Sequence, residues 1–143
     1  MAGARACFNG LVKTGESFVL GRGYTRREIH NVVGGNLQQY MPSVDGRVVA
    51  VCINPDPRLQ PLPPAQLFIG PGPTIRGHAI ALAAQDEPVP VFIRRAAHDW
   101  EFKGSWRPVR LETDPDLVRK EKARAGVTRP VFGVLWLEPY AVT

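Results

Sequence analysis

Amide and phenol side chains crowd into one short stretch that has no clear helix or strand periodicity. Asn36, Gln38 and Gln39 supply three amides, and Tyr40 follows them directly. An amide presents a donor and an acceptor side by side, which suits the edge of a nucleobase, and a phenol ring can stack on a base. The stretch therefore predicts a polar arm that contacts nucleic acid. The alternative is a loop that hydrogen-bonds only its own backbone.

Two adjacent arginines precede this arm. Thr25 and Glu28 have the spacing of a capping box, so we expect a helix over residues 26–33. Arg26 and Arg27 then lie in its first turn, where the helix dipole mildly disfavours cations. Their position favours contact with an outside anion such as phosphate, and solvated arginines are the alternative.

Aromatic and basic side chains also gather in a predicted hairpin. Val89–Arg95 and Trp100–Gly104 alternate with period two around a turn, as antiparallel strands do. If the indole of Trp100 or Trp106 faces a concave surface, it could form, together with Tyr40, the wall of a pocket for an extruded base. Core packing is the alternative for the tryptophans. The basic residues of this hairpin form a predicted cluster of Arg94, Arg95, Lys103 and Arg107. The alternative is that these side chains are only solvated.

The net charge of +5 is unevenly distributed along the chain. Residues 1–30 carry five basic residues (Lys or Arg) and two acidic ones. Residues 31–93 carry three basic and four acidic residues, and residues 94–143 carry ten basic and seven acidic residues. The basic excess thus belongs to the two ends of the chain, which a compact fold could bring onto one face. Such a face predicts a polyanionic partner, most often nucleic acid.

Length and composition indicate one globular domain over residues 1–143, with 44% hydrophobic and 22% charged residues. No apolar run is long enough to cross a bilayer, so we expect no membrane contact. Cys7 and Cys52 form no disulfide framework, and Cys52 lies in an apolar run typical of a buried thiol. We therefore expect a cytoplasmic protein.

Residue patterns for catalysis are missing. His30, His78 and His98 stand outside the spacings of zinc sites, and the sequence has no Gly-x-Ser-x-Gly elbow. We expect no metal, no cofactor and no catalytic activity of the domain by itself. A small hydrolase with His30 or His98 as its base is one alternative.

The order of elements predicts an α+β fold. Strands are expected over Phe8–Val12, Phe18–Leu20, Arg47–Ile53, Gln66–Ile69, Val89–Arg95, Trp100–Gly104, Trp106–Leu111 and Val131–Leu137. Helices are expected over Arg26–Val33, from a Thr74 cap to Gln85, and over Pro115–Ala125. Without alternating βαβ units, these predict a strongly bent, mostly antiparallel sheet or small barrel with about three packed helices.

Five prolines between Asn54 and Pro64 predict a stiff surface loop. A protein-interaction module that uses this loop is therefore a second alternative for function.

Several short motifs carry a resemblance to known proteins. They are Tyr24-Thr25-Arg26-x-Glu28-Ile29, Gly34-Gly35, Gln39-x-x-Pro42, Asp45-Gly46-Arg47-Val48-Val49, Asn54-Pro55, Pro90-Val91-Phe92-Ile93-Arg94 and Trp100-Glu101-Phe102-x-Gly104. From about Gly21 to Leu111 the chain resembles a domain found beside HNH modules in bacterial restriction-type proteins. The closing strands more loosely resemble the barrel of the PUA-like superfamily, which includes the SRA, EVE, YTH and ASCH domains.

The resemblance implies binding of DNA, with a modified base gripped in an aromatic-lined pocket. The sequence lacks an HNH-like cluster of histidines and asparagines, so we expect a binding domain that relies on a nuclease partner or fusion for cutting. The predicted contact residues are Tyr24, Thr25, Arg26, Arg27, Asn36, Gln38, Gln39, Tyr40, Arg94, Arg95, Lys103 and Arg107, with Tyr40, Trp100 and Trp106 as the base pocket.

Overall fold

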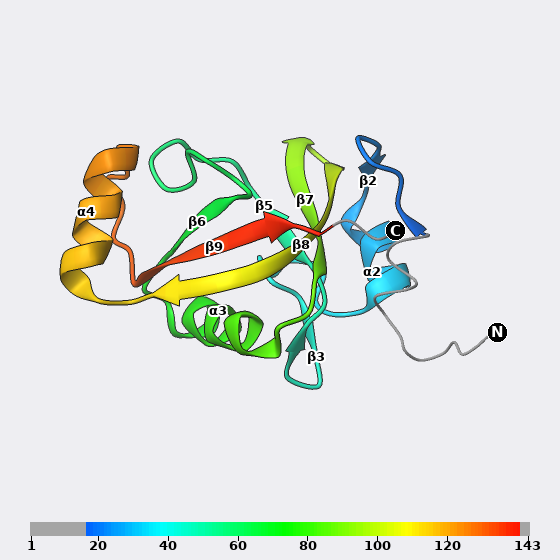
Figure 1. Cartoon of the computed structure of the whole chain (residues 1–143). Coiled ribbons are helices and arrows are strands. Elements are labelled where there is room, and N and C mark those ends of the chain that lie inside the picture. Colours follow the sequence, from blue (N-terminus) through cyan, green and yellow to red (C-terminus); the bar gives the residue numbers. More distant parts are fainter. Residues whose placement is uncertain (1–16, 141–143) are drawn as a thin grey trace.

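A strongly curled, mixed β-sheet forms the centre of the molecule. The computed structural model describes residues 17–140. The strands of the sheet are β2 (Gly23–Tyr24), β5 (Val51–Ile53), β6 (Gln66–Ile69), β7 (Val89–Ala96), β8 (Asp99–Glu112) and β9 (Gly133–Pro139). Their order is β5-β7-β8-β9-β6, and β2 pairs with β8 beside this path (Figure 1). β5 lies parallel to β7, whereas the other neighbours are antiparallel.

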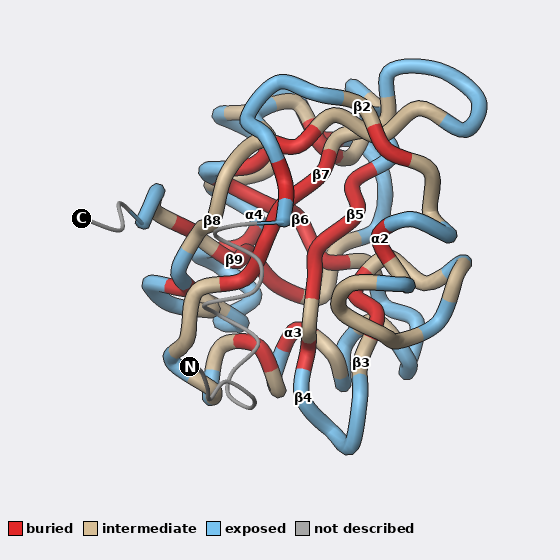
Figure 2. The backbone as a smooth tube through the Cα atoms, turned by 90° about the vertical axis from the view of Figure 1, so that its right-hand side faces the viewer, coloured by how far each residue is buried: buried red, intermediate tan, exposed pale blue. Residues whose placement is uncertain are grey.

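Helices and a small hairpin surround the sheet. They are α2 (Arg26–Val33), α3 (Pro73–Gln85), α4 (Pro115–Ala125) and the hairpin of β3 (Ser43–Val44) and β4 (Arg47–Val48). α2 and α4 lie at opposite ends of the molecule (Figure 1). Buried residues follow the inner strands, while the hairpin tip and outer loops are exposed (Figure 2). The predicted α+β class with a bent sheet is confirmed.

Local capping signals set the start of both outer helices. Thr25 Oγ1 accepts a hydrogen bond from Glu28 N at 3.1 Å, and Glu28 Oε1 accepts one from Thr25 N at 2.8 Å. This is the predicted capping box, and α2 begins directly after it. At α4, Asp114 Oδ2 accepts a hydrogen bond from Leu117 N at 3.2 Å. Both predicted helix starts are confirmed.

The start of α3 differs from the prediction. Gly72, rather than Thr74, is the N-cap, and Pro73 is the first residue of the helix. Proline suits this position because its ring fixes φ near the helical value and a first-turn N–H has no partner within the helix. Ile80 of this helix is 52% exposed.

Two predicted strands merge and another divides. Trp100–Gly104 and Trp106–Leu111 both belong to β8, because the glycine at the end of the first range takes φ +94° and forms a bulge opposite β7. The predicted strand Arg47–Ile53 divides into β4 and β5. After β4 the backbone leaves the β3–β4 hairpin, and Val49 N donates a hydrogen bond to Pro42 O at 2.9 Å at this point.

The predicted strand Phe18–Leu20 is absent. Its phenylalanine instead packs edge-on against Tyr24 and Phe92, with ring centres 5.0 and 4.9 Å away. The strand predicted over Val131–Leu137 is β9, which begins two residues later. The strand predicted over Phe8–Val12 lies outside the described residues.

An aromatic core lies beneath α2. Its buried members include Phe18, Tyr24, Ile29, Phe92 and Phe102. α2 contributes Ile29, and Trp100 packs against the edge of the group while remaining half buried. Aromatic rings bury large apolar areas, so this core fixes α2 against β7 and β8.

Two glutamine side chains pair with strand backbone. Gln60 is buried, its Oε1 accepts from Phe68 N at 3.0 Å, and its Nε2 donates to Phe68 O at 2.8 Å. Gln85 makes the same pair of bonds with Val48, at 3.0 and 2.8 Å. Each amide takes the place of a neighbouring strand, so these backbone groups remain hydrogen-bonded.

The proline-rich segment Asn54–Pro64 is a loop, as predicted. The carboxylate of Asp56 pairs with Arg58 at 3.3 Å and with Arg129 at 3.1 Å. Arg58 O also accepts backbone hydrogen bonds from Thr128 N and Arg129 N, at 3.0 and 3.3 Å. These contacts tie the loop to the segment that follows α4.

Candidate nucleic-acid interface

One row of the sheet places a tryptophan beside basic side chains. The pairing of β2 with β8 and of β8 with β7 aligns Tyr24, Trp100 and Arg94 across three strands. The guanidinium carbons of Arg26 and Arg94 lie 5.3 and 6.0 Å from the centre of the Trp100 ring. These are cation–π distances. The sequence predicted this neighbourhood for Arg94 and Trp100, and the structure adds Arg26 from α2.

Two further arginines extend this surface. The guanidinium carbon of Arg22 lies 5.6 Å from the centre of the Tyr24 ring, and Arg27 is exposed in the first turn of α2. We name the group the basic platform, and it consists of Trp100 with Arg22, Arg26, Arg27 and Arg94. Within residues 17–140, none of these four arginines forms an ion pair with a carboxylate. Their positive charge is therefore uncompensated by close carboxylates.

The other basic residues of the predicted cluster are paired with acids. Arg95 bonds Asp99 at 3.0 Å and donates to Gly21 O at 3.2 Å, and its hydrogen bonds to Asp99 raise the pKa of its guanidinium. Lys103 lies 3.6 Å from Glu101. Arg107 forms an ion pair with Glu138, and these hydrogen bonds raise its pKa too. These three residues contribute less to an anion-binding surface than the platform arginines do.

The expected gathering of both basic ends on one face is wrong for α4. This helix and its cations lie at the end of the molecule opposite α2 (Figure 1). Arg119 pairs with Asp116 at 2.9 Å, and Arg124 pairs with Glu121 at 3.1 Å. The sequence totals could not show this, because charge counts do not contain the direction in which a helix leaves the sheet.

Tyr24 and Thr25 hold the fold together. Tyr24 is only 9% exposed, and its hydroxyl accepts a hydrogen bond from Val19 N at 2.8 Å. Thr25 uses its hydroxyl for the helix cap. Both predicted contact residues therefore have structural roles, Tyr24 in the aromatic core and Thr25 in the cap of α2.

The polar arm is held by Arg26 and by its own first residue. Arg26 Nη2 donates to Asn36 O and to Gln39 O, at 2.9 Å each. Asn36 Oδ1 accepts hydrogen bonds from Gln38 N at 2.6 Å and from Gln39 N at 3.1 Å. The Asn36 side-chain oxygen is therefore used within the arm, while the Gln38 side chain lies at an exposed position.

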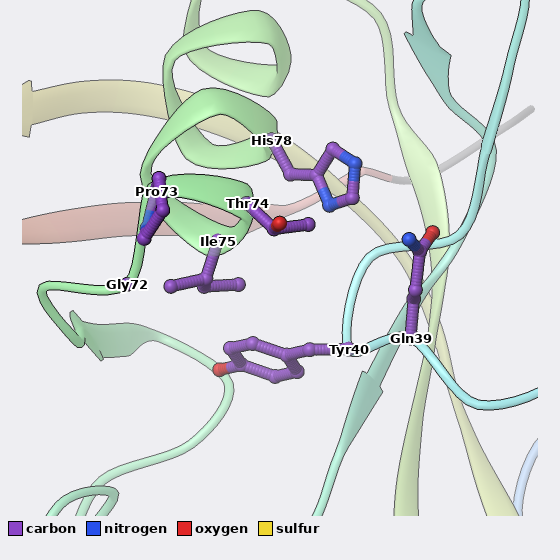
Figure 3. Close-up of a pocket in the computed structure, with 7 residues that line it drawn as sticks. All are labelled: Gln39, Tyr40, Gly72, Pro73, Thr74, Ile75 and His78. Atoms are coloured by element: carbon purple, nitrogen blue, oxygen red, sulfur yellow. The ribbon is translucent and has the colours of Figure 1, made fainter.

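A hollow of about 270 Å³ lies between this arm and the first turns of α3 (Figure 3). Its lining residues are Gln39, Tyr40, Gly72, Pro73, Thr74, Ile75 and His78. The Gln39 side chain extends toward His78, while Tyr40 lies below Ile75 (Figure 3). The hollow thus combines apolar walls with amide, hydroxyl and imidazole groups.

The phenol of Tyr40 is fixed at the inner side of the hollow. Its hydroxyl accepts a hydrogen bond from Gln60 Nε2 at 3.0 Å. Burial raises the pKa of Tyr40 well above its ordinary value, so the hydroxyl stays neutral. Tyr40 O accepts from Cys52 N at 2.8 Å, which anchors the arm to β5.

Trp106 lies apart from this hollow. Its indole N–H donates to Lys103 O at 2.8 Å, and its ring packs against the main apolar core beside the sheet. The predicted base pocket of Tyr40, Trp100 and Trp106 is therefore distributed over three places: the hollow, the basic platform and the core.

The remaining reactive groups are separate from one another. His30 Nδ1 lies 2.7 Å from Gly35 O at the end of α2, and His98 is exposed in the β7–β8 turn at φ +61°. Cys52 is a buried free thiol, as predicted, and burial raises its pKa to about 12. In residues 17–140, no three of the His, Cys, Asp and Glu side chains group as metal ligands would. The described helices are too short or too polar to cross a bilayer.

In comparisons with known proteins, no family model, curated protein or solved structure matches this chain.

Sequence reasoning missed the α3 side of the hollow. Gly72, Pro73 and Thr74 resemble an ordinary loop and helix start, and His78 stood alone on a helix. Only the tertiary packing of α3 against the arm brings them to Gln39 and Tyr40. The N-cap of α3 is Gly72, which offers no side-chain cap, whereas the sequence predicted Thr74 at that position.

Proposed function

We propose that this chain binds nucleic acid through the basic platform. The proposal rests on one observation, that four arginines without described carboxylate partners lie at the α2 end, two of them, Arg26 and Arg94, over the Trp100 ring. The four arginines come from the segment before β2, from α2 and from β7. Unpaired arginines attract phosphates, and a half-exposed indole offers a surface on which a base can stack.

Phosphates and a base would contact different parts of this end of the molecule. Arg22, Arg27 and Arg94 of the platform would take the phosphates, which position a strand without reading it. The hollow beside Gln39 and Tyr40 would take one unstacked base. Its volume of about 270 Å³ is near the lower limit of small-ligand pockets, about 300 Å³, which suits one planar ring system.

On the resemblance described above, we further propose that the polymer is DNA and that a modified base is preferred. A nuclease partner or fused module in the cytoplasm would then do the cutting.

Binding is tested by fluorescence anisotropy with labelled oligonucleotides. The set contains plain, methylated and hydroxymethylated sequences, single and double stranded, at two salt concentrations. We expect the affinity to fall by about tenfold or more between about 50 and about 200 mM salt, because each phosphate contact releases counterions. No binding at the lower salt, or binding that does not respond to salt, contradicts the proposal.

Arg22 and Arg27 are the residues to change first. Arg26 is less suitable because its guanidinium also holds the arm. The Arg22→Ala/Arg27→Ala variant should bind nucleic acid more weakly than the wild type. It should leave intact any protein binding by the loop Asn54–Pro64, which lies on another part of the fold and would be the function of a protein-interaction module.

A further inference from the structure

We infer that Arg26 is a positioning residue, which joins the hollow to the basic platform and presents the arm for binding without itself taking up a phosphate. The inference rests on the proposed function and assigns a role within that site. Arg26 was predicted as a phosphate contact from its place in the first helical turn.

One nitrogen of the Arg26 guanidinium is already fully used. This nitrogen, Nη2, donates to two carbonyl oxygens, those of Asn36 and Gln39, at 2.9 Å each. The planar guanidinium also lies over the Trp100 ring, 5.3 Å from the ring centre. A phosphate on Nη2 would have to displace both backbone bonds, and one on Nε or Nη1 would meet a side chain already held between the arm and the Trp100 ring. Arg27, its neighbour in sequence, has no such bond among the described residues and is exposed.

One of the two carbonyls that Arg26 holds belongs to a residue that lines the hollow, and the other belongs to the first residue of the arm. Gln39 lines the hollow, and the next residue, Tyr40, forms its inner side (Figure 3). Asn36 starts the arm, and its side chain closes the turn that leads to Gln39. Fixing both carbonyls therefore fixes the direction in which the Gln39 amide enters the hollow.

The Arg26 side chain also links the arm to the Trp100 ring. Arg26 contacts Gln39 on one side and Trp100 on the other, so one residue connects the hollow to the platform. A strand with phosphates near Arg22, Arg27 and Arg94 would thus meet an arm held at a fixed distance. Pre-ordering a binding segment increases affinity, because less conformational entropy is lost on binding.

The test compares Arg26→Lys with the matched variant Arg27→Lys in the same helical turn. Lysine keeps the charge but lacks the planar fork that spans two carbonyls and stacks on an indole. For Arg26→Lys we expect affinity for a single-stranded oligonucleotide to fall about tenfold, which is the scale of losing a charged hydrogen bond. In the free protein, amide hydrogen exchange at Gln38 and Gln39 should accelerate about tenfold. Arg27→Lys should change neither quantity by more than about twofold.

A second pair of variants separates positioning from phosphate contact. Arg26→Gln removes a charge and should lower affinity while leaving the slope of log affinity against log salt unchanged. Arg27→Gln should reduce that slope by about 0.7 to 0.9, the value for one lost phosphate contact. Circular dichroism confirms that each variant is folded before it is compared.

Three results overturn the inference. They are wild-type affinity in Arg26→Lys, unchanged exchange of the arm amides in that variant, and a slope in Arg26→Gln reduced as much as in Arg27→Gln. If the wild-type protein binds no oligonucleotide, the proposed function fails, and with it the role in binding. The exchange experiment then still decides whether Arg26 holds the arm.

Discussion

The two ends of this molecule carry similar basic composition but use it differently. At the α2 end, three arginines lie over aromatic rings and Arg27 is exposed in the first turn of α2, and none of the four has a carboxylate partner in residues 17–140. At the α4 end, Arg119, Arg124 and Arg129 each pair with an acid, at 2.9 to 3.1 Å. Lys120 of that helix is exposed and Lys122 is half buried, and neither has an ion pair within residues 17–140. Unlike three of the platform arginines, these lysines have no described aromatic ring beside them.

The difference shows that the positions of carboxylates matter more than the number of cations. A cation with an acid at hydrogen-bond distance produces little net field, whereas several unpaired arginines on one surface add their fields. Aromatic rings at the α2 end hold the guanidinium groups without neutralising them. For this reason the proposed anion binding is located at the α2 end, although the sequence places more cations near the C-terminus.

The aromatic core is the part of the α2 end whose loss should cost the most. Phe92 is fully buried between Phe18, Tyr24 and Phe102. Phe92→Ala should lower the free energy of unfolding by about 3–5 kcal/mol, the usual range for a buried Phe. Urea denaturation measures this value. A loss below about 1 kcal/mol would show that α2 does not depend on these rings.

Gln60 is the next residue to change, because it is buried in the fold and its amide donates to Tyr40, which lines the hollow. Gln60→Ala leaves Phe68 N–H and C=O without their described partners and removes the donor to the Tyr40 hydroxyl. We expect a loss of about 2–3 kcal/mol, given about 1–3 kcal/mol for each buried group left unpaired. The isosteric change Gln60→Glu is the companion variant, since it keeps the size but loses a donor. An unchanged unfolding midpoint in both variants contradicts this role.

Filling the hollow sharpens the comparison without altering any charge. Ile75→Trp places a large ring into the hollow, whereas Ile80→Trp adds the same ring on the 52% exposed side of the same helix. Affinity for a single-stranded oligonucleotide should fall about tenfold in the first variant and remain unchanged in the second, since excluding one stacked base costs about 1–3 kcal/mol. An oligonucleotide that lacks one base should bind both variants equally. Equal affinities of the two variants for the intact strand would remove the hollow from the site.

The smallest effect is expected at Asp56, which compensates cations near the α4 end. Hydrogen bonds from Arg58, first from its backbone N–H and then from its side chain, lower the pKa of Asp56 against the opposing effect of desolvation. The pKa of Asp56 is lower in the folded protein than in the unfolded chain. Its carboxylate therefore stabilises the fold at pH values above its ordinary pKa, and this stabilisation is lost as the pH falls through the folded-state pKa. The stability difference between wild type and Asp56→Asn should shrink as pH falls from about 6 to about 3. A difference that grows over this range would contradict the assignment.

Elements defined by local chemistry could be predicted from the sequence. The capping box at Thr25, the cap at Asp114 and the loop at Asn54–Pro64 depend on residues close together in the chain, and all three are present. Strand limits were less predictable. Gly104 continues β8 through a bulge because β7 lies beside it, and no local signal contains that neighbour.

The candidate site was only partly visible for the same reason. The arm, Arg26 and Trp100 were all singled out, but their contact depends on how α2 packs over the sheet. The division between paired and unpaired arginines also depends on tertiary structure, since Arg107 meets Glu138 from the neighbouring strand β9. The residues of α3 that line the hollow carry no pattern that local reasoning could use.

The central claim is that polyanions bind at the α2 end rather than at the α4 end. Its direct test is the salt dependence of oligonucleotide binding in two double variants that each remove two positive charges, Arg22→Ala/Arg27→Ala and Lys120→Ala/Lys122→Ala. We predict that the first reduces the slope of log affinity against log salt by about two, at up to about 0.9 per contact, and that the second leaves it unchanged. Equal reductions in both variants, or a larger one in the second, would contradict the account.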